Sequence, residues 1–131
     1  MKLKDLGEFN FINRIDRTIK LSGRVIKGIG DDAAVLKYTK DKYMLFTADM
    51  LVEGKHFHKC DKAALVGKKA LSCNISDIAA MGGSPKFAVI SVGFPGSLDL
   101  KYADELYKGI RKIADKFKVD LVGGDTVGSG K

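Results

Sequence analysis

The chain has 131 residues, of which 45% are hydrophobic and 30% are charged, with a formal net charge of +7. This length suits one domain with a single core, and the composition excludes intrinsic disorder. Apolar runs fall short of the ~20 residues of a membrane span, and the N-terminus lacks the apolar core of a signal peptide. We therefore expect a cytoplasmic protein without a membrane partner. The lysines are scattered along the chain, so we expect no nucleic-acid partner either.

The first half of the chain predicts one helix, a hairpin and a second, longer helix. Apolar residues recur at steps of three and four over residues 6–19, which is typical of an amphipathic helix. Two short β-prone runs at 33–38 and 43–47 predict an antiparallel hairpin. The long helix is expected to run from Asp61, as its N-cap, to about Met81, where two glycines and a proline stop it.

The second half predicts a strand, a helix and a final short strand. Residues 86–94 are nearly all apolar or small, which predicts a strand buried on both faces. Asp99 caps a second long helix, whose apolar stripe continues to Phe117. Residues 119–122 form a short strand that leads into Gly-Gly-Asp. The order predicts an α+β fold with a mostly antiparallel sheet and two long helices on one face. We expect one domain over residues 1–131 and, from its turn-like end, a fragment of a longer polypeptide.

Four short segments place an aspartate where a strand or helix gives way to glycine or other small residues, at Asp32, Asp49, Asp77 and Asp125. Turn chemistry explains an aspartate beside glycine, but Asp77 lies in an apolar helix, with Asn74 one turn before it on the same face. If the fold brings these carboxylates together, their repulsion requires hard cations, and oxygen ligands suit Mg²⁺ bound with phosphates. The sequence therefore indicates a phosphoryl-transfer enzyme.

Three other patterns are open to alternative interpretations. Residues 28–33 imitate the dinucleotide fingerprint G-x-G-x-x-A, but they precede a strand instead of a helix. Residues 125–131 imitate a P-loop, with an aspartate at the place of its first glycine. One segment also contains four candidate zinc ligands, which are Glu53, His56, His58 and Cys60. Both cysteines are treated as reduced thiols. Lys68, Lys69 and Arg111 are expected to be solvated charges on a helix face, with contact to a phosphate as the alternative for any of them.

The ordered motifs resemble the N-terminal half of the thiamine-monophosphate kinase family, which belongs to the superfamily of aminoimidazole ribonucleotide synthetase. The match is carried by residues 28–35 (Gly-Ile-Gly-Asp-Asp-Ala-Ala-Val), 49–57, 69–82 (with Asn-Ile-Ser-Asp) and 123–126 (Gly-Gly-Asp-Thr). The resemblance implies the N-terminal domain fold of that superfamily. It also implies ATP-dependent phosphorylation of thiamine monophosphate to thiamine diphosphate, with several Mg²⁺ ions and no protein nucleophile.

The resemblance also implies roles for individual positions. It implies Mg²⁺ ligands at Asp32, Thr47, Ala48, Asp49, Asp77 and Asp125. It implies a substrate contact at His56 and nucleotide contacts at Tyr107, Gly124 and Asp125. Ala48 departs from the family, which often has a hydroxyl residue there, so only its backbone carbonyl can contribute. A homodimer through the N-terminal domains is implied as well. Two alternatives remain: another ATP-dependent enzyme of the superfamily, or a non-catalytic nucleotide-binding module.

Overall fold

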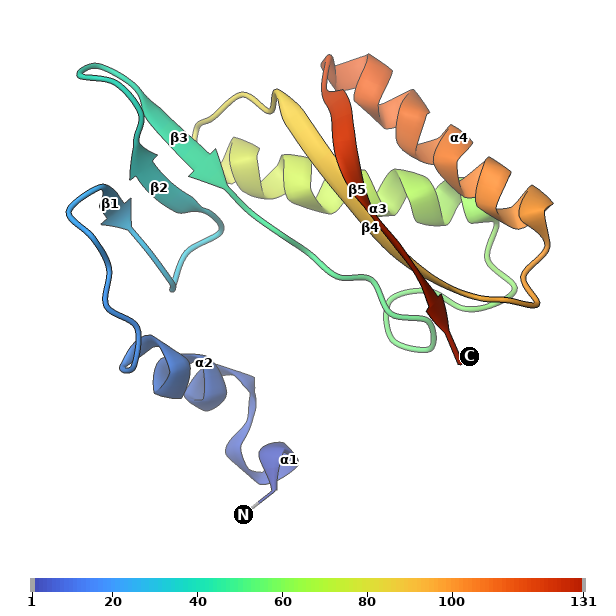
Figure 1. Ribbon diagram of the computed structural model, residues 1–131, viewed down its shortest axis with the longest axis horizontal. Helices are drawn as coiled ribbons and strands as arrows, with labels where there is room; N and C mark the ends of the chain where they lie inside the picture. Colours follow the sequence, from blue (N-terminus) through green and yellow to red (C-terminus); the bar gives the residue numbers. More distant parts are fainter. Residues whose placement is uncertain (1, 131) are drawn as a thin grey trace. The chain divides into compact units, whose positions relative to one another are not determined.

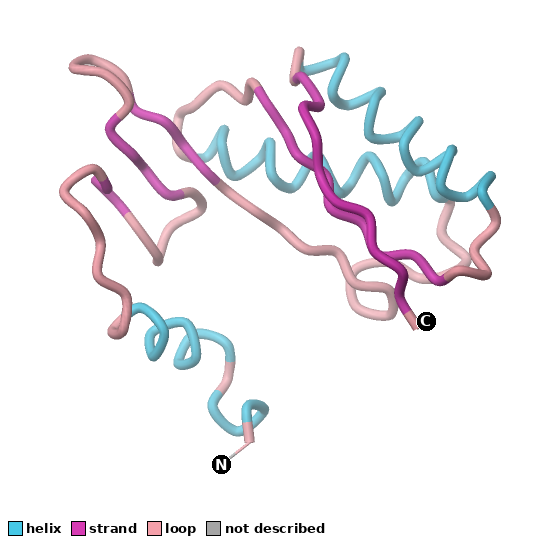
Figure 2. Tube along the Cα trace, in the orientation of Figure 1, coloured by secondary structure: helices cyan, strands magenta, loops and turns pink. Residues whose placement is uncertain are grey.

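The computed structural model describes residues 2–130, and the chain divides into two compact units between Thr47 and Ala48. The first unit contains α1 (Leu3–Leu6), α2 (Glu8–Asp16), β1 (Val25–Lys27), β2 (Ala34–Lys37) and β3 (Tyr43–Phe46), labelled in Figure 1. The second unit contains α3 (Ala63–Ala80), β4 (Phe87–Pro95), α4 (Leu100–Phe117) and β5 (Asp120–Ser129). Figure 2 shows the same trace by secondary structure. Over residues 2–130, the helices are too short or too polar to cross a membrane.

The N-terminal helix is interrupted where the sequence predicted one continuous helix over residues 6–19. Gly7 separates α1 from α2 and has a φ of 77° and a ψ of 163°, which no helix can accommodate. α2 then ends at Asp16, because the Thr18 hydroxyl donates to the Ile15 carbonyl at 2.7 Å and the chain leaves the helical path. The amphipathic pattern was therefore right about the type of element and wrong about its bounds.

The three strands of the first unit form an antiparallel sheet in the order β1-β2-β3. β2 pairs with β3 from Ala34 opposite Phe46 to Lys37 opposite Tyr43, so the predicted hairpin is confirmed. β1 was not predicted, because a strand of three residues is too short to show an alternating pattern.

Helix α3 begins one residue later than predicted and has a different cap. Its N-cap is Lys62, without a side-chain hydrogen bond. Asp61 instead accepts from the backbone N–H of His58 at 2.8 Å, so its carboxylate closes the preceding turn and does not cap the helix. The predicted end is confirmed, since Gly82 has a φ of 71° and stops the helix after Met81.

Helix α4 packs against α3 at close range. Its predicted cap is confirmed, because the Asp99 carboxylate accepts from the backbone N–H of Lys101. A Cβ on Gly67 would lie 2.0 Å from the carbonyl oxygen of Leu106, and one on Gly109 would lie 2.0 Å from that of Ala64. Glycine at both positions therefore lets the two backbones touch. The buried core of the second unit lies between these helices and the inner face of the strands.

Strands β4 and β5 pair in parallel, and α3 and α4 cover one face of this pair (Figure 1). β4 was predicted to be buried on both faces, but its residues alternate, with Phe87 and Val89 exposed and Ala88 and Ile90 packed against the core. β5 is longer than predicted and continues through Gly124 to Ser129. The predicted α+β class, the antiparallel sheet and the two helices on one face are confirmed.

Candidate functional site

The loop that carries Asp32 joins β1 to β2 in the first unit. Its neighbour Asp31 forms an ion pair with Lys27 and also accepts from the backbone N–H of Asp32 at 2.9 Å. These two hydrogen bonds, the one from Lys27 first, lower the pKa of Asp31. Asp31 is thus engaged within the loop, and exposed Asp32 is the carboxylate that the loop can offer to a ligand. The loop leads into β2 and not into a helix, which confirms that residues 28–33 are no dinucleotide fingerprint.

Asn74 fastens the segment after β3 to helix α3. The backbone N–H of Asp49 donates to Oδ1 of Asn74 at 3.1 Å, and Nδ2 of Asn74 donates to the carbonyl of Ala70 at 3.1 Å. Each end of the side-chain amide therefore has a partner, which fixes its orientation. Asp77 follows Asn74 by one turn of the same helix, so the second unit ties Asp49 to the helix that carries Asp77. Ala48 precedes Asp49, and Thr47 ends the first unit.

The remaining predicted contacts lie on α4 and β5. Asp125 is exposed within β5, where its carboxylate accepts from the backbone N–H of Thr126 at 2.9 Å. Gly124 precedes it with a φ of 152°, and a Cβ there would lie 1.8 Å from the Ile90 carbonyl oxygen. Glycine at 124 therefore permits the close strand pairing that carries Asp125. Tyr107 is half-buried and packs against the core of the second unit.

The loop that carries His56 has a defined conformation. The backbone N–H of Val52 donates to Nδ1 of His56 at 2.9 Å, and the backbone N–H of His56 donates to the Val52 carbonyl at 2.9 Å. Because Nδ1 accepts, the ring proton lies on Nε2. The carbonyl of His56 accepts from Nζ of Lys69 on α3 at 2.5 Å, and Phe57 packs against the core. Lys69 is exposed, as predicted for a charge on a helix face, and it also donates to this carbonyl, which was not predicted.

Tyr102, at the start of α4, lies near the acidic residues of the same loop region. Burial of its phenol raises its pKa, and the negative charges of Glu53 and Asp61 raise it further. No local sequence pattern indicates this contact, because Tyr102 stands about forty positions or more from both carboxylates.

The described residues form no metal site from protein side chains alone. Among residues 2–130, no three side chains of His, Cys, Asp or Glu lie close enough together to hold a metal ion. This includes the zinc alternative of Glu53, His56, His58 and Cys60, which lies within the second unit. Cys60 and Cys73 are both free thiols, as predicted. What the structure brings together is Asp49 with α3 and His56 with α3, both within the second unit.

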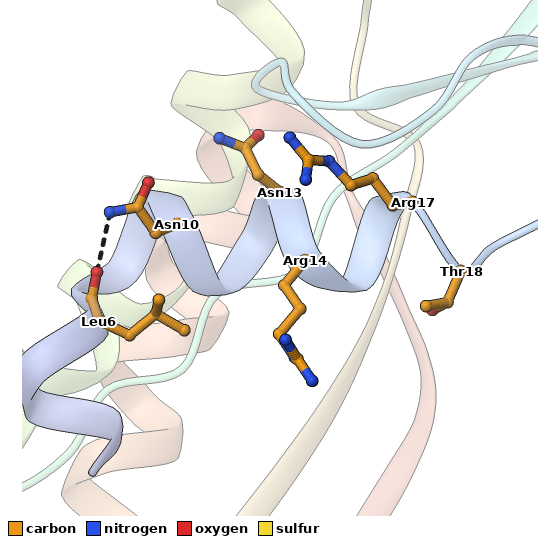
Figure 3. A pocket seen from close by; sticks show the side chains of 6 residues that line it. All are labelled: Leu6, Asn10, Asn13, Arg14, Arg17 and Thr18. Atoms are coloured by element: carbon orange, nitrogen blue, oxygen red, sulfur yellow. Dashed lines mark hydrogen bonds between the residues drawn. The ribbon is translucent and has the colours of Figure 1, made fainter. Parts of the chain in front are cut away.

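A surface hollow of about 530 Å³ lies on the N-terminal helices of the first unit, lined by Leu6, Asn10, Asn13, Arg14, Arg17 and Thr18. Figure 3 shows Arg17 beside Asn13 on one side of α2 and Arg14 extending on the other. The two guanidinium groups therefore do not converge, and the hollow contains none of the predicted site residues.

A known family of domains matches most of this chain. Residues 30–131 match the family model described as AIR synthase related protein, N-terminal domain. The chain belongs to this family. All of the proposed contact positions, from Asp32 to Asp125, lie inside the matched range.

Relatives within the family point to a narrower group. The chain is 41% identical over 125 residues to the thiamine-monophosphate kinase of Aquifex aeolicus, covering 95% of this chain and 39% of the relative. It is 40% identical over 124 residues to that of Bacillus subtilis, covering 93% and 38%. The solved structure of AaThiL complexed with AMPPCP and TMP superposes with a TM-score of 0.91 at 40% identity, covering 100% of this chain and 40% of that one. The chain thus spans about two fifths of the length of these relatives.

Proposed function

We propose that this chain is the single ATP- and Mg²⁺-binding N-terminal domain, residues 1–131, of a cytoplasmic thiamine-monophosphate kinase that converts thiamine monophosphate and ATP into thiamine diphosphate and ADP. The AaThiL complex supports both substrates, because AMPPCP is an analogue of ATP and TMP is the phosphate acceptor. The observation that carries the proposal for this chain is the hydrogen bond from Asp49 to Asn74, which ties one carboxylate segment to the helix of Asp77.

The donor set fits Mg²⁺ shared with phosphates. Its proposed side-chain donors are oxygens only, from Asp32, Asp49, Asp77 and Asp125, and the resemblance adds Thr47 and the Ala48 carbonyl. Mg²⁺ keeps several waters and is usually held by one or two carboxylates together with substrate phosphates. A group of three protein ligands is therefore unnecessary, and exposed Asp49 and Asp125 leave room for water and phosphate in the coordination shell. When bound, Mg²⁺ would offset the charge of the phosphates.

The chain's own residues bind and orient the two substrates. The proton on Nε2 lets His56 donate a hydrogen bond to an acceptor phosphate while its Nδ1 stays on Val52. Tyr107 and Gly124 are proposed to meet the nucleotide. No protein nucleophile is required, since the attacking atom is an ionised phosphate oxygen and the difficulty is repulsion between two anions. The protein therefore has to hold donor and acceptor in line and to offset their negative charge.

We also propose a homodimer formed through the outer face of β4 and β5. This face carries Phe87, Val89 and Val127, which are 70%, 67% and 53% exposed. Large apolar side chains grouped on one sheet face favour association, because covering them removes apolar surface from water. Sedimentation equilibrium of the purified chain should give a dimer; a monomer at all concentrations would contradict this part.

The test of the proposed reaction is a direct assay. The native polypeptide that carries this sequence is incubated with ATP, Mg²⁺ and thiamine monophosphate, and thiamine diphosphate is measured by chromatography. Asp77→Asn should nearly abolish turnover, whereas Ser76→Ala, one residue away and exposed, should not change it. ATP consumption with a different phosphate acceptor, or nucleotide binding without any turnover, would overturn the assignment in favour of another superfamily enzyme or a binding module.

A further inference from the structure

The loop of residues 52–57 is attached to helix α3 by a single charged side chain. Nζ of Lys69 donates to the backbone carbonyl of His56 at 2.5 Å. The remaining bonds of the loop are internal and include Val52 to Nδ1 of His56 and Gly54 to the Phe57 carbonyl, at 2.9 and 2.8 Å. Lys69 is thus the polar link between the histidine's own backbone and the rigid part of the second unit.

We infer that Lys69 is a positioning residue for the acceptor substrate, acting through His56; this rests on the proposed function of His56 as an acceptor contact. A lysine ammonium bound to a carbonyl is a charge-assisted hydrogen bond, which is stronger than a neutral one. By holding the His56 carbonyl, Lys69 fixes the backbone on which the imidazole is mounted. The Val52 bond then selects the ring orientation with its proton on Nε2.

The position of Lys69 fits this role better than that of a general surface charge. It lies on α3 thirteen residues after His56, and Phe57 is packed against the core beside the contact. The loop is therefore fixed at two consecutive residues, by an apolar contact at Phe57 and a polar one at His56. Lys68, the preceding residue on the same helix, is half-buried and forms no ion pair within the described chain, so it provides a control of the same residue type.

The first test measures the histidine directly. Histidine-labelled chain is examined by long-range ¹H–¹⁵N NMR, which separates the two neutral tautomers of His56, and the amide exchange of Val52 is followed. Lys69→Met should mix the tautomers and accelerate exchange at Val52 by about tenfold, whereas Lys68→Met should match the wild type. Lys69→Arg should restore the single tautomer, because its guanidinium can donate to the same carbonyl. An unchanged His56 signal in Lys69→Met overturns the inference on its own.

The second test is kinetic. In the native polypeptide, Lys69→Met should raise the KM for thiamine monophosphate about tenfold and leave the KM for ATP unchanged, with rescue by Lys69→Arg. Equal loss toward both substrates indicates a general structural role and refutes positioning. A wild-type protein that neither binds nor phosphorylates thiamine monophosphate overturns the proposed function, and with it the substrate part of this inference. The NMR result still decides separately whether Lys69 controls His56.

Discussion

Replacing Asn74 with alanine should weaken both the fold and the binding of nucleotide. The substitution removes two hydrogen bonds of 3.1 Å, from the Asp49 N–H and to the Ala70 carbonyl. At about 1 kcal/mol net for each bond, the free energy of unfolding should fall by about 2 kcal/mol. The exposed Asp49 then becomes mobile, and ordering one residue again upon binding costs about 1–2 kcal/mol. We therefore expect the Kd for Mg²⁺ with AMPPCP to rise about tenfold.

Isothermal titration calorimetry measures that Kd, and urea unfolding followed by circular dichroism measures the stability. Ser76→Ala is the control, because Ser76 is exposed on the same helix. Asn74→Asp separates the two bonds, since it keeps an acceptor for the Asp49 N–H and loses the donor to Ala70. If folded Asn74→Ala binds the nucleotide with wild-type affinity, Asn74 does not hold the carboxylate segment in place, and the argument built on this bond fails.

Three further predictions concern packing, a backbone strain and a titration. Gly67→Ala places a Cβ 2.0 Å from the Leu106 carbonyl oxygen, so α3 and α4 must separate. The free energy of unfolding should fall by a net amount of about 2 kcal/mol, despite the gain of about 1 kcal/mol in helix propensity. A stabilised variant in urea unfolding would contradict the close packing. Lys118 is left-handed, with a φ of 55°, so Lys118→Gly should raise the free energy of unfolding by about 0.5–1 kcal/mol, and a loss would refute that strain. The raised pKa of Tyr102 means that the folded chain keeps its phenol proton above the ordinary pKa of 10.0. Stability should therefore decrease as the pH rises from about 10, and Tyr102→Phe should remove that part of the decrease in urea titrations; identical pH profiles would refute it.

Local signals in the sequence predicted elements well where a single residue controls the backbone. Asp99 caps α4 and Gly82 stops α3, because capping and left-handed conformation depend on neighbouring residues only. Asp61 had the same capping signal, but its carboxylate was taken by the His58 backbone three positions earlier. The carboxylate of a cap residue can accept either from the N–H groups of the following helix or from those of the preceding turn, and the sequence alone does not decide between them.

The extent of β5 could not be read from its own residues. Gly123 and Gly124 normally end a strand, yet they lie inside this one, and Gly124 faces Ile90 across the pair. The reason is tertiary: only a residue without a Cβ fits against the Ile90 carbonyl, where one would lie at 1.8 Å. The exposed face of β4 was not predicted for a related reason. A strand with apolar residues on both faces does not reveal whether this chain buries both faces or only one.

For the candidate site too, the sequence predicted local relations between residues but not contacts between distant ones. Spacing placed Asn74 and Asp77 on one helix face, but the partner of Asn74 is twenty-five positions away and the partner of Lys69 is thirteen away. Helical periodicity shows which residues share a face and not what binds to that face. The four-motif resemblance supplied the grouping, and the hydrogen bonds supplied the physical link for Asp49 and His56.

Helix α3 also sets the separation between the two anchored segments. Lys69 and Asn74 are five residues apart on the same helix, so their backbones are separated by roughly 7.5 Å along its axis. One anchor holds the carboxylate segment at Asp49, and the other holds the loop of His56. Under the proposed function, the first anchor serves the metal end of the reaction and the second serves the acceptor end, and catalysis depends on the spacing between them. Inserting one residue between the anchors would turn one of them by about 100° around the helix and break one contact, which explains why a single rigid helix carries both.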